Sequence, residues 1–557
     1  MQYFTKRLKF FIETVSRQPR QDGSEGLKTI PGAPRSLIFA LGSIYMTAAW
    51  SNFVTLLGES TPSPDQIEQA GNTLRIGITE DPGQSLAPLF QQLLEQLPPT
   101  TRPQELAWGQ ILQIIDHFLS QEQGWQPSYL KPLLALYQLL GTNSNVRHQL
   151  LHICSSIGDR DCLGAIADVL CTDPPVSSTT VGVVMSPLFQ GRDLSYDTLF
   201  PRLFDTLEHP SVAAATLDLA NHLVRKEHFS CHPGTDHLES LQLLLRDLNR
   251  RMEQLAEHPD HSGEDAQQTS LMISESIALM IALCDTLALV GEVSSVAALR
   301  QTLDLPHRRL QVESASALAK LGESIGTETL VALAAEPVVR LHVLAYAEEL
   351  DVTEQIDPTY RSDLSRAEGQ LALWLAQDQQ MGIAPTEMEC VDQRVQFWPG
   401  YDQPLSCFLI RYRFLFGDSI YSNLGIVGPV THSVTADIET LTIEDAYALF
   451  AGWHAEHEEI YERDVAHLDP SQLVDVQRFQ RSLHDQGYQQ IEPSIWGSFL
   501  GDPVLGATAV KNGVPGIVVT DSSDIYWHPR LESPRPLTPD DVYNLYKGRK
   551  LLKTFNP

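Results

Sequence analysis

One pattern recurs through the middle of this 557-residue chain and limits how it can fold. Three stretches place apolar residues at three-to-four spacing, then a glycine followed by an acidic residue, then a second amphipathic run: residues 145–170, 276–303 and 307–334. This spacing predicts helices. Gly158, Gly291 and Gly322 stand where a helix ends in a left-handed C-cap. We therefore expect a series of helical hairpins.

The glycines also give a repeat length. Gly291 and Gly322 lie 31 residues apart, the spacing of one helical hairpin repeat. Weaker copies begin at Pro210 and at Pro337. A single hairpin cannot bury its apolar face alone, so such repeats stack on one another. Small residues such as Ala315 let neighbouring helices approach closely. The sequence thus predicts a stacked helical array.

A proline or polar turn, a pair such as Val-Arg, and small residues at packing positions recur in these copies. The pattern resembles the HEAT repeat family, including bacterial HEAT-like repeats of phycobilin-lyase type, over roughly residues 106–351. The resemblance implies an α-solenoid whose concave surface holds a protein partner. The same resemblance leaves open an enzyme or enzyme subunit, lyase-like, that uses the repeats as a cradle for a substrate protein or pigment.

The pattern changes after Asp351. A helix over 365–380 closes the array, and residues 405–429 then alternate as a strand does, with Phe408, Ile410, Tyr412, Phe414 and Phe416 on one face. Gly417-Asp418 and Asn512-Gly513 predict hairpin turns.

Helices are expected over 442–464, from Asp469-Pro470 onward, and at the C-terminal end of the chain. The predicted fold is mostly α. It has an N-terminal segment with an apolar helix (1–60), a HEAT-like α-solenoid (61–380), and a smaller α+β C-terminal domain (383–557).

Charge narrows the partners. The chain has 70 acidic and 39 basic residues, a formal charge of −31. Such a chain repels phosphate backbones, which argues against sequence-independent nucleic-acid binding and favours a protein partner with a basic or mixed surface. Its seven cysteines include no C-x-x-C pair, as expected of a cytoplasmic protein with free thiols.

One N-terminal segment resembles a membrane anchor in part. Residues 36–58 contain no charge, and basic residues precede them. Ser43, Thr47 and Ser51 dilute the apolar run, which favours a buried or partner-facing helix. A membrane-anchored adaptor remains an alternative.

The helix predicted over 442–464 contains a candidate metal or acid–base site. His454, His457 and Glu458 are spaced to share one side of a helix. The H-E-x-x-H pattern fails, because Tyr461 stands where the second histidine belongs. A third ligand would have to come from elsewhere, such as His432. The alternative is a structural helix that covers the sheet.

A second candidate is a zinc site. His228, Cys231 and His232 are three and four residues apart, which places them within one helical turn. Pro233-Gly234 breaks the segment, however, so an exposed loop between repeats is the alternative. No other cofactor is expected.

No nucleophile elbow, phosphate loop or dinucleotide fingerprint occurs, and no catalytic residue is assigned. The function expected is therefore that of a non-catalytic scaffold.

Overall fold

The structure is a computed structural model. It describes residues 86–556 apart from 97–104, 120–124, 142–145, 191–193, 258–264, 418, 456–459, 500, 522 and 531, together with five residues between 66 and 72. The predicted N-terminal segment 1–60, with its apolar run 36–58, lies outside the described residues. The chain divides into two compact units, 1–199 and 200–557. Each is described by itself.

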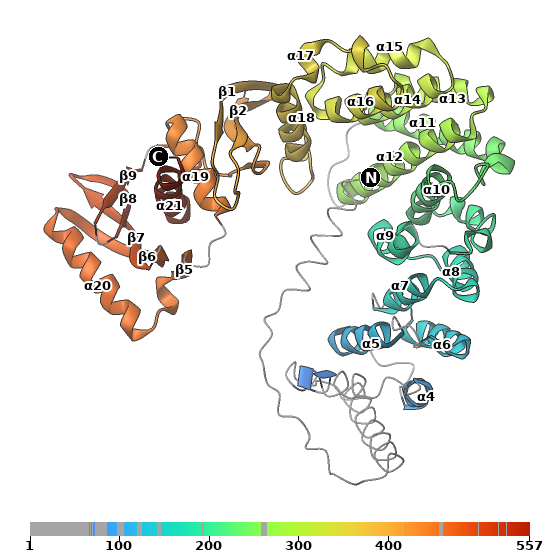
Figure 1. Ribbon diagram of the computed structural model, residues 1–557, viewed down its shortest axis with the longest axis horizontal. Helices are drawn as coiled ribbons and strands as arrows, with labels where there is room; N and C mark the ends of the chain where they lie inside the picture. Colours follow the sequence, from blue (N-terminus) through green and yellow to red (C-terminus); the bar gives the residue numbers. More distant parts are fainter. Residues whose placement is uncertain are drawn as a thin grey trace, which may run out of the picture. The chain divides into compact units, whose positions relative to one another are not determined.

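The described part of the first unit is helical (Figure 1). Its longer helices are α4 (Ala87–Gln96), α5 (Glu105–Leu119), α6 (Leu130–Leu140), α7 (Arg147–Ile157), α8 (Arg160–Thr172) and α9 (Ser178–Met185). The α7–α8 hairpin confirms the first predicted pair. Gly158 ends α7 at φ +68° and donates its N–H to the carbonyl of Cys154, and Asp159 caps α8 through the N–H of Cys162.

The second unit begins with further helices: α10 (Pro210–Arg225), α11 (Leu238–Glu257), α12 (Asp265–Val290), α13 (Val296–Asp304), α14 (Arg308–Lys320), α15 (Ser324–Leu333), α16 (Pro337–Glu349), α17 (Pro358–Arg361) and α18 (Asp363–Leu375). Helices α10, α12, α14 and α16 pack in succession and form one layer, while α11, α13 and α15 lie on its other side (Figure 1). The predicted hairpins at Gly291 and Gly322 are confirmed, with φ of +79° and +85°.

Small residues do let helices approach closely, as expected. A Cβ on Gly326 of α15 would lie 2.5 Å from the carbonyl oxygen of Ala315 in α14. This contact requires glycine on one side of the hairpin and a small residue on the other.

Two antiparallel sheets follow the helices, so the chain is mostly α with a smaller α+β part at its C-terminal end. The first sheet has strands β1 (Glu387–Gln396), β2 (Leu405–Phe416), β3 (Ser419–Val427) and β4 (His432–Ser433), in that order. The second has β5 (Ile460–Asp464), β6 (Tyr488–Phe499), β7 (Asp502–Lys511), β8 (Val514–Thr520) and β9 (Ile525–Pro529), in that order. Both predicted hairpin turns are confirmed: Gly417 has φ +58°, and Asn512 and Gly513 have φ +53° and +80°.

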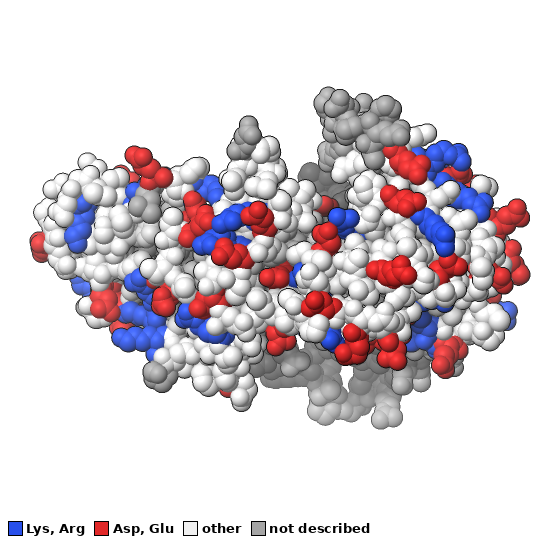
Figure 2. Space-filling model, turned by 90° about the horizontal axis from the view of Figure 1, so that it is seen from above, with Lys and Arg blue, Asp and Glu red and all other residues white. Residues whose placement is uncertain are grey.

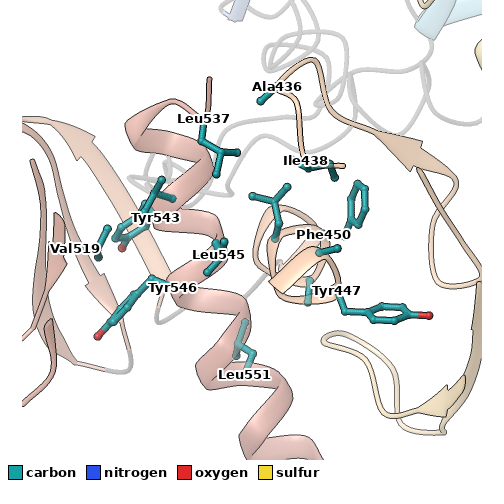
Figure 3. Close-up of a cluster of buried hydrophobic side chains, with 14 of the residues drawn as sticks. Ala436, Ile438, Tyr447, Phe450, Val519, Leu537, Tyr543, Leu545, Tyr546 and Leu551 are labelled. Carbon is teal, nitrogen blue, oxygen red and sulfur yellow. The ribbon is translucent and has the colours of Figure 1, made fainter. Parts of the chain in front are cut away.

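Each sheet has one helix packed on each of its two faces. The first lies between α18 and α19 (Ile443–His454), and the second between α20 (Pro470–Asp485) and α21 (Pro539–Phe555). The predicted strand face is confirmed for Phe408, Ile410, Tyr412 and Phe414, which pack on α18. Helices α19 and α21 lie side by side between the sheets, with Tyr447 directed away from α21 and Tyr546 directed away from α19 (Figure 3).

The two halves of this region share one plan, a helix, a four-stranded antiparallel meander and a second helix, and β5 adds an edge strand to the second sheet. The second helices also share a sequence. "LTIEDAYALFAG" (441–452) and "LTPDDVYNLYKG" (537–548) are identical at six of twelve positions. Thr442 and Thr538 each cap a helix by accepting the N–H of an aspartate three residues on. The region is therefore an internal duplication.

The repeated glycines form the contact between the two halves. A Cβ on Gly452 would lie 1.8 Å from the carbonyl oxygen of Asn544, and a Cβ on Gly548 would lie 1.7 Å from that of Ala448. Asn544 and Ala448 occupy the same position in the two copies. The contact is thus reciprocal, and the α19 and α21 backbones touch where their side chains are only hydrogen atoms.

Helix α18 is shared by the helical array and the first sheet. It stacks on α16 and also carries Leu371 and Leu375 into the core of the sheet. The change in sequence pattern near 380 therefore marks a change of secondary structure but no break in packing. The boundary between the two compact units, at 199/200, falls inside the span predicted as one domain, 61–380.

One expected element is wrong. The helix predicted over 442–464 ends at His454, because Ala455 takes extended angles (φ −64°, ψ 107°). Residues 460–464 instead form β5, whose backbone pairs with β6 from Ile460 opposite Phe499 to Asp464 opposite Ile495. Pairing with a strand over thirty residues away overrides the helical periodicity of this segment.

Candidate functional site

The layer formed by α10, α12, α14 and α16 presents one continuous face. Neighbouring helices in it run in the same direction. Asn221 of α10 donates its side-chain N–H to the carbonyl of Ala282 in α12 (3.2 Å), and one turn further on Arg225 reaches Asp285. Parallel alignment places equivalent stripes of the four helices side by side.

Six charged side chains and one tyrosine cross this face from helix to helix, and we call them the charged row: Arg225 (α10), Asp285 (α12), Arg309, Glu313 and Lys320 (α14), and Tyr346 and Glu349 (α16). Arg225 forms a bidentate pair with Asp285. Lys320 bonds Glu349 at 2.8 Å and lies 5.3 Å from the ring centre of Tyr346. The row carries three basic and three acidic side chains, and these are paired with one another.

Glu313 is the most buried member of the charged row. Burial raises the pKa of its carboxyl, and the guanidinium of Arg309 at 2.5 Å opposes that rise. The hydroxyl of Tyr346 donates to its other oxygen at 2.5 Å. Burial and the neighbouring Glu313 charge raise the pKa of Tyr346. The pair therefore ties α14 to α16 by a charge-assisted hydrogen bond with little access to water.

Apolar side chains on α12 continue the same face. Leu271, Ala278 and Asp285 are seven residues apart, so they lie on one side of the helix. Leu271 is 59% exposed and Met272 49%. No residue from 268 to 278 is buried, whereas most from 279 to 287 are. The face thus has an apolar part on the first half of α12 beside the charged row.

Length explains this exposure. Helix α12 has 26 residues, whereas α10 has 16 and α14 has 13, so its first half has fewer neighbours. Among the described helices, residues 268–290 form the one stretch long and apolar enough to cross a membrane by length and composition. Only 39% of its most apolar window is buried. Its two charged residues, Glu275 and Asp285, lie within the span.

Behind the face, a buried polar network fixes α10 against α12. His232 accepts the N–H of Gly234 at its Nδ1 (2.9 Å), so its Nε2 carries the proton and donates to Asn221 (3.0 Å). Thr286 donates to the same Asn221 oxygen at 2.9 Å. Burial lowers the pKa of His232 to about 4. The imidazole is therefore neutral at physiological pH.

One residue of the predicted zinc site, His232, belongs to this network. His232 is buried with both ring nitrogens engaged, so it has no lone pair to offer a metal in this arrangement. His228 and Cys231 are exposed in the connection between α10 and α11. No group of three His, Cys, Asp or Glu side chains able to hold a metal ion occurs in the described part of the chain. Zinc at this place stays a prediction.

Of the other predicted set, the structure describes one residue, His454. His454 is the last residue of α19, and its Nδ1 accepts the indole N–H of Trp398 (3.2 Å). His457 and Glu458 lie outside the described residues. The shorter helix removes the reason to expect these residues on one helical turn. His432, considered as a third ligand, does lie in the same region, stacked on Trp453.

Comparison with protein-family models, with curated proteins and with solved structures finds no match to this chain. The candidate function therefore depends on the chain's own sequence and on the geometry of the described residues.

The α12 face was missed at the level of sequence. Residues 257–270 suggest a polar loop, yet α12 already begins at Asp265. The available signal was that apolar residues from Leu271 to Val290 occur on every side of the helix, which is typical of a helix enclosed by partners.

Proposed function

We propose that this protein is a non-catalytic scaffold that binds a protein partner on the face formed by α10, α12, α14 and α16. The resemblance of its hairpins to HEAT repeats supports this, because stacked helical repeats of that family present extended binding surfaces. The proposal treats the helical array as an α-solenoid.

The exposed apolar half of α12 is the observation that carries the proposal. Leu271 and Met272 are among the largest apolar side chains exposed on the array. Burying one such side chain is worth roughly 1.5–3 kcal/mol. Exposed apolar side chains bordered by charges have the composition of a protein interface, with an apolar centre and a polar rim.

Charge indicates the kind of partner. The charged row is paired within itself and presents both signs of charge. Acidic and basic side chains are interspersed on the side of the molecule shown in Figure 2. With a formal charge of −31 overall, a partner with a basic or mixed surface fits best, and association should weaken as salt rises.

The test introduces charges at the two exposed apolar positions, Leu271 and Met272. In the full-length protein, Leu271→Asp combined with Met272→Asp should abolish retention of a stoichiometric partner, because two buried apolar contacts become desolvated charges. Leu243→Asp is the matched control, since Leu243 is 56% exposed on α11, in the other layer. A photo-crosslinking amino acid at position 271, but not at 243, should capture the same partner.

Two results would contradict the proposal. One is a partner that the double variant retains as well as the parent protein does. The other is equal crosslinking from both positions. Turnover of a small molecule by the purified protein would instead favour an enzyme.

A further inference from the structure

A cluster of aromatic side chains lies where α19 meets the first sheet, away from the α12 face. The imidazole of His432 lies flat on the indole of Trp453, with ring centres 3.6 Å apart and 6° between the planes. Trp374 of α18 meets His432 edge-on at 5.5 Å. Trp453 itself is 45% exposed. His432 and its neighbours therefore hold the indole in place while leaving much of it open to solvent.

A second exposed ring stands beside the first. Tyr401 stacks on His454 at 6.2 Å with 18° between the planes, and it is 42% exposed. His454 in turn lies 6.3 Å from Trp453. The Tyr401 hydroxyl donates to the carbonyl of Pro429 at 2.8 Å, which fixes the ring. Trp453 and Tyr401 thus flank His454 as two oriented aromatic surfaces.

The cluster carries no positive charge of its own at neutral pH. Burial lowers the pKa of His432 to about 4. His454 accepts a hydrogen bond at Nδ1, which requires the neutral ring. No lysine or arginine among the described residues lies over Trp453 or Tyr401, although other aromatic rings in this region are covered in that way.

The duplicated half shows what occupies the equivalent place. Arg549 stands at the position of Trp453 and Lys550 at that of His454. Arg549 lies 4.4 Å from the ring centre of Tyr526 and pairs with Asp445. Lys550 pairs with Asp521. In the second half, cations that pair within the molecule occupy the positions equivalent to Trp453 and His454. In the first half, these positions carry aromatic rings, and no described lysine or arginine lies over Trp453.

We propose that the exposed indole of Trp453 binds an arginine side chain from a basic segment of a protein partner, with Tyr401 offering a second ring to the same segment on the other side of His454. A cation over the face of tryptophan is the strongest of the cation–π pairs. Arginine fits better than lysine because its planar guanidinium also stacks on rings. The protein uses the same pairing internally, with Arg535 4.0 Å from the ring centre of Tyr421 and Arg394 4.4 Å from that of Tyr447. The net charge of −31 attracts such a segment.

The experiment compares three fluorescent peptides, six repeats each of Gly-Arg, Gly-Lys and Gly-Gln, by anisotropy with the full-length protein at 0.15 M salt. Trp453→Ala should weaken binding of the arginine peptide about threefold to tenfold. It should change binding of the lysine peptide less than twofold. Trp453→Phe, which keeps an aromatic ring, should bind the arginine peptide with an affinity between those of the parent protein and Trp453→Ala.

Phe555→Ala is the matched control, because Phe555 is an exposed aromatic residue at the far end of α21. Equal losses for the arginine and lysine peptides would overturn the proposal, since charge alone would then explain binding. So would an unchanged arginine affinity in Trp453→Ala, or an equal loss in Phe555→Ala. The α12 double variant should leave this peptide binding unchanged, so failure here and failure of the α12 face are distinguishable.

Discussion

Substituting the glycines where α19 and α21 cross should destabilise the protein. Gly452→Ala would place a Cβ 1.8 Å from the carbonyl oxygen of Asn544, whereas ordinary contacts begin near 3.4 Å. The obstacle is backbone in the partner helix and cannot rotate away. The two helices must therefore separate by about 1.6 Å at this point. That separation loosens the core that both helices share with the two sheets.

The magnitude follows from two opposing effects. Overpacking a core costs about 1–3 kcal/mol and occasionally more, and here the overlap is with backbone. Alanine in place of glycine inside a helix returns about 1 kcal/mol. We expect a net loss of about 2 kcal/mol from either Gly452→Ala or Gly548→Ala, the upper end of that cost less the gain. The double variant should lose much less than the sum, because one separation relieves both overlaps.

The assay is denaturant unfolding together with hydrogen exchange of the α19 and α21 amides. Gly164→Ala in α8 is the control, because its Cβ would lie 3.7 Å from Thr198, an ordinary contact. That variant should be neutral or slightly more stable. Unchanged exchange in α19 and α21 of Gly452→Ala would refute the close approach of the backbones, and additive losses in the double variant would refute the shared crossing.

Two further predictions concern buried polar groups. The pKa of His232 is about 4 in the folded protein and near 6.5 in the unfolded chain. As the pH falls, the unfolded state therefore binds the proton first. The contribution of His232 to the free energy of unfolding is thus present above pH 6.5 and falls by roughly 3 kcal/mol as the pH drops toward 4. The difference in unfolding free energy between the parent protein and His232→Gln should shrink over that range, and a constant difference would contradict the neutral imidazole. Arg340→Ala should cost about 3–5 kcal/mol, because its buried guanidinium donates to the carbonyls of Ala334 and Ser365 and pairs with Glu368. Arg340→Lys should restore only part of that loss in the same denaturation assay, since an ammonium cannot reach all three acceptors.

Contacts between residues far apart in the sequence also determine which carboxyl groups in the C-terminal part are ionised. Asp521 is held ionised, because hydrogen bonds from Lys550 and Tyr546 outweigh its burial and keep its pKa well below the usual range. Its other oxygen accepts the backbone N–H groups of Ser523 and Asp524. The basic residues at the end of α21 are therefore largely used within the molecule.

Local sequence determined the elements whose signals lie within a few residues. The left-handed glycines that end helices and the Asn512-Gly513 turn depend on neighbours in the chain, and both are present as expected. The caps at Thr442 and Thr538 are equally local, since each threonine accepts an N–H three residues on. Helix–glycine–helix hairpins follow for the same reason. The duplicated "LTxxDxYxLxxG" pattern was equally open to inspection and indicates a repeat without any coordinates.

Tertiary structure decided what depends on distant partners. Residues 460–464 became a strand because β6 supplies backbone hydrogen bonds that no local pattern contains. His232 became a buried network member because Asn221 meets it, with Thr286 reaching the same oxygen from 65 residues along the chain. The exposed half of α12 arises because its neighbours are shorter. Burial, pairing and exposure are properties of the surfaces that meet in space, and residue spacing along one helix cannot specify which surfaces those are.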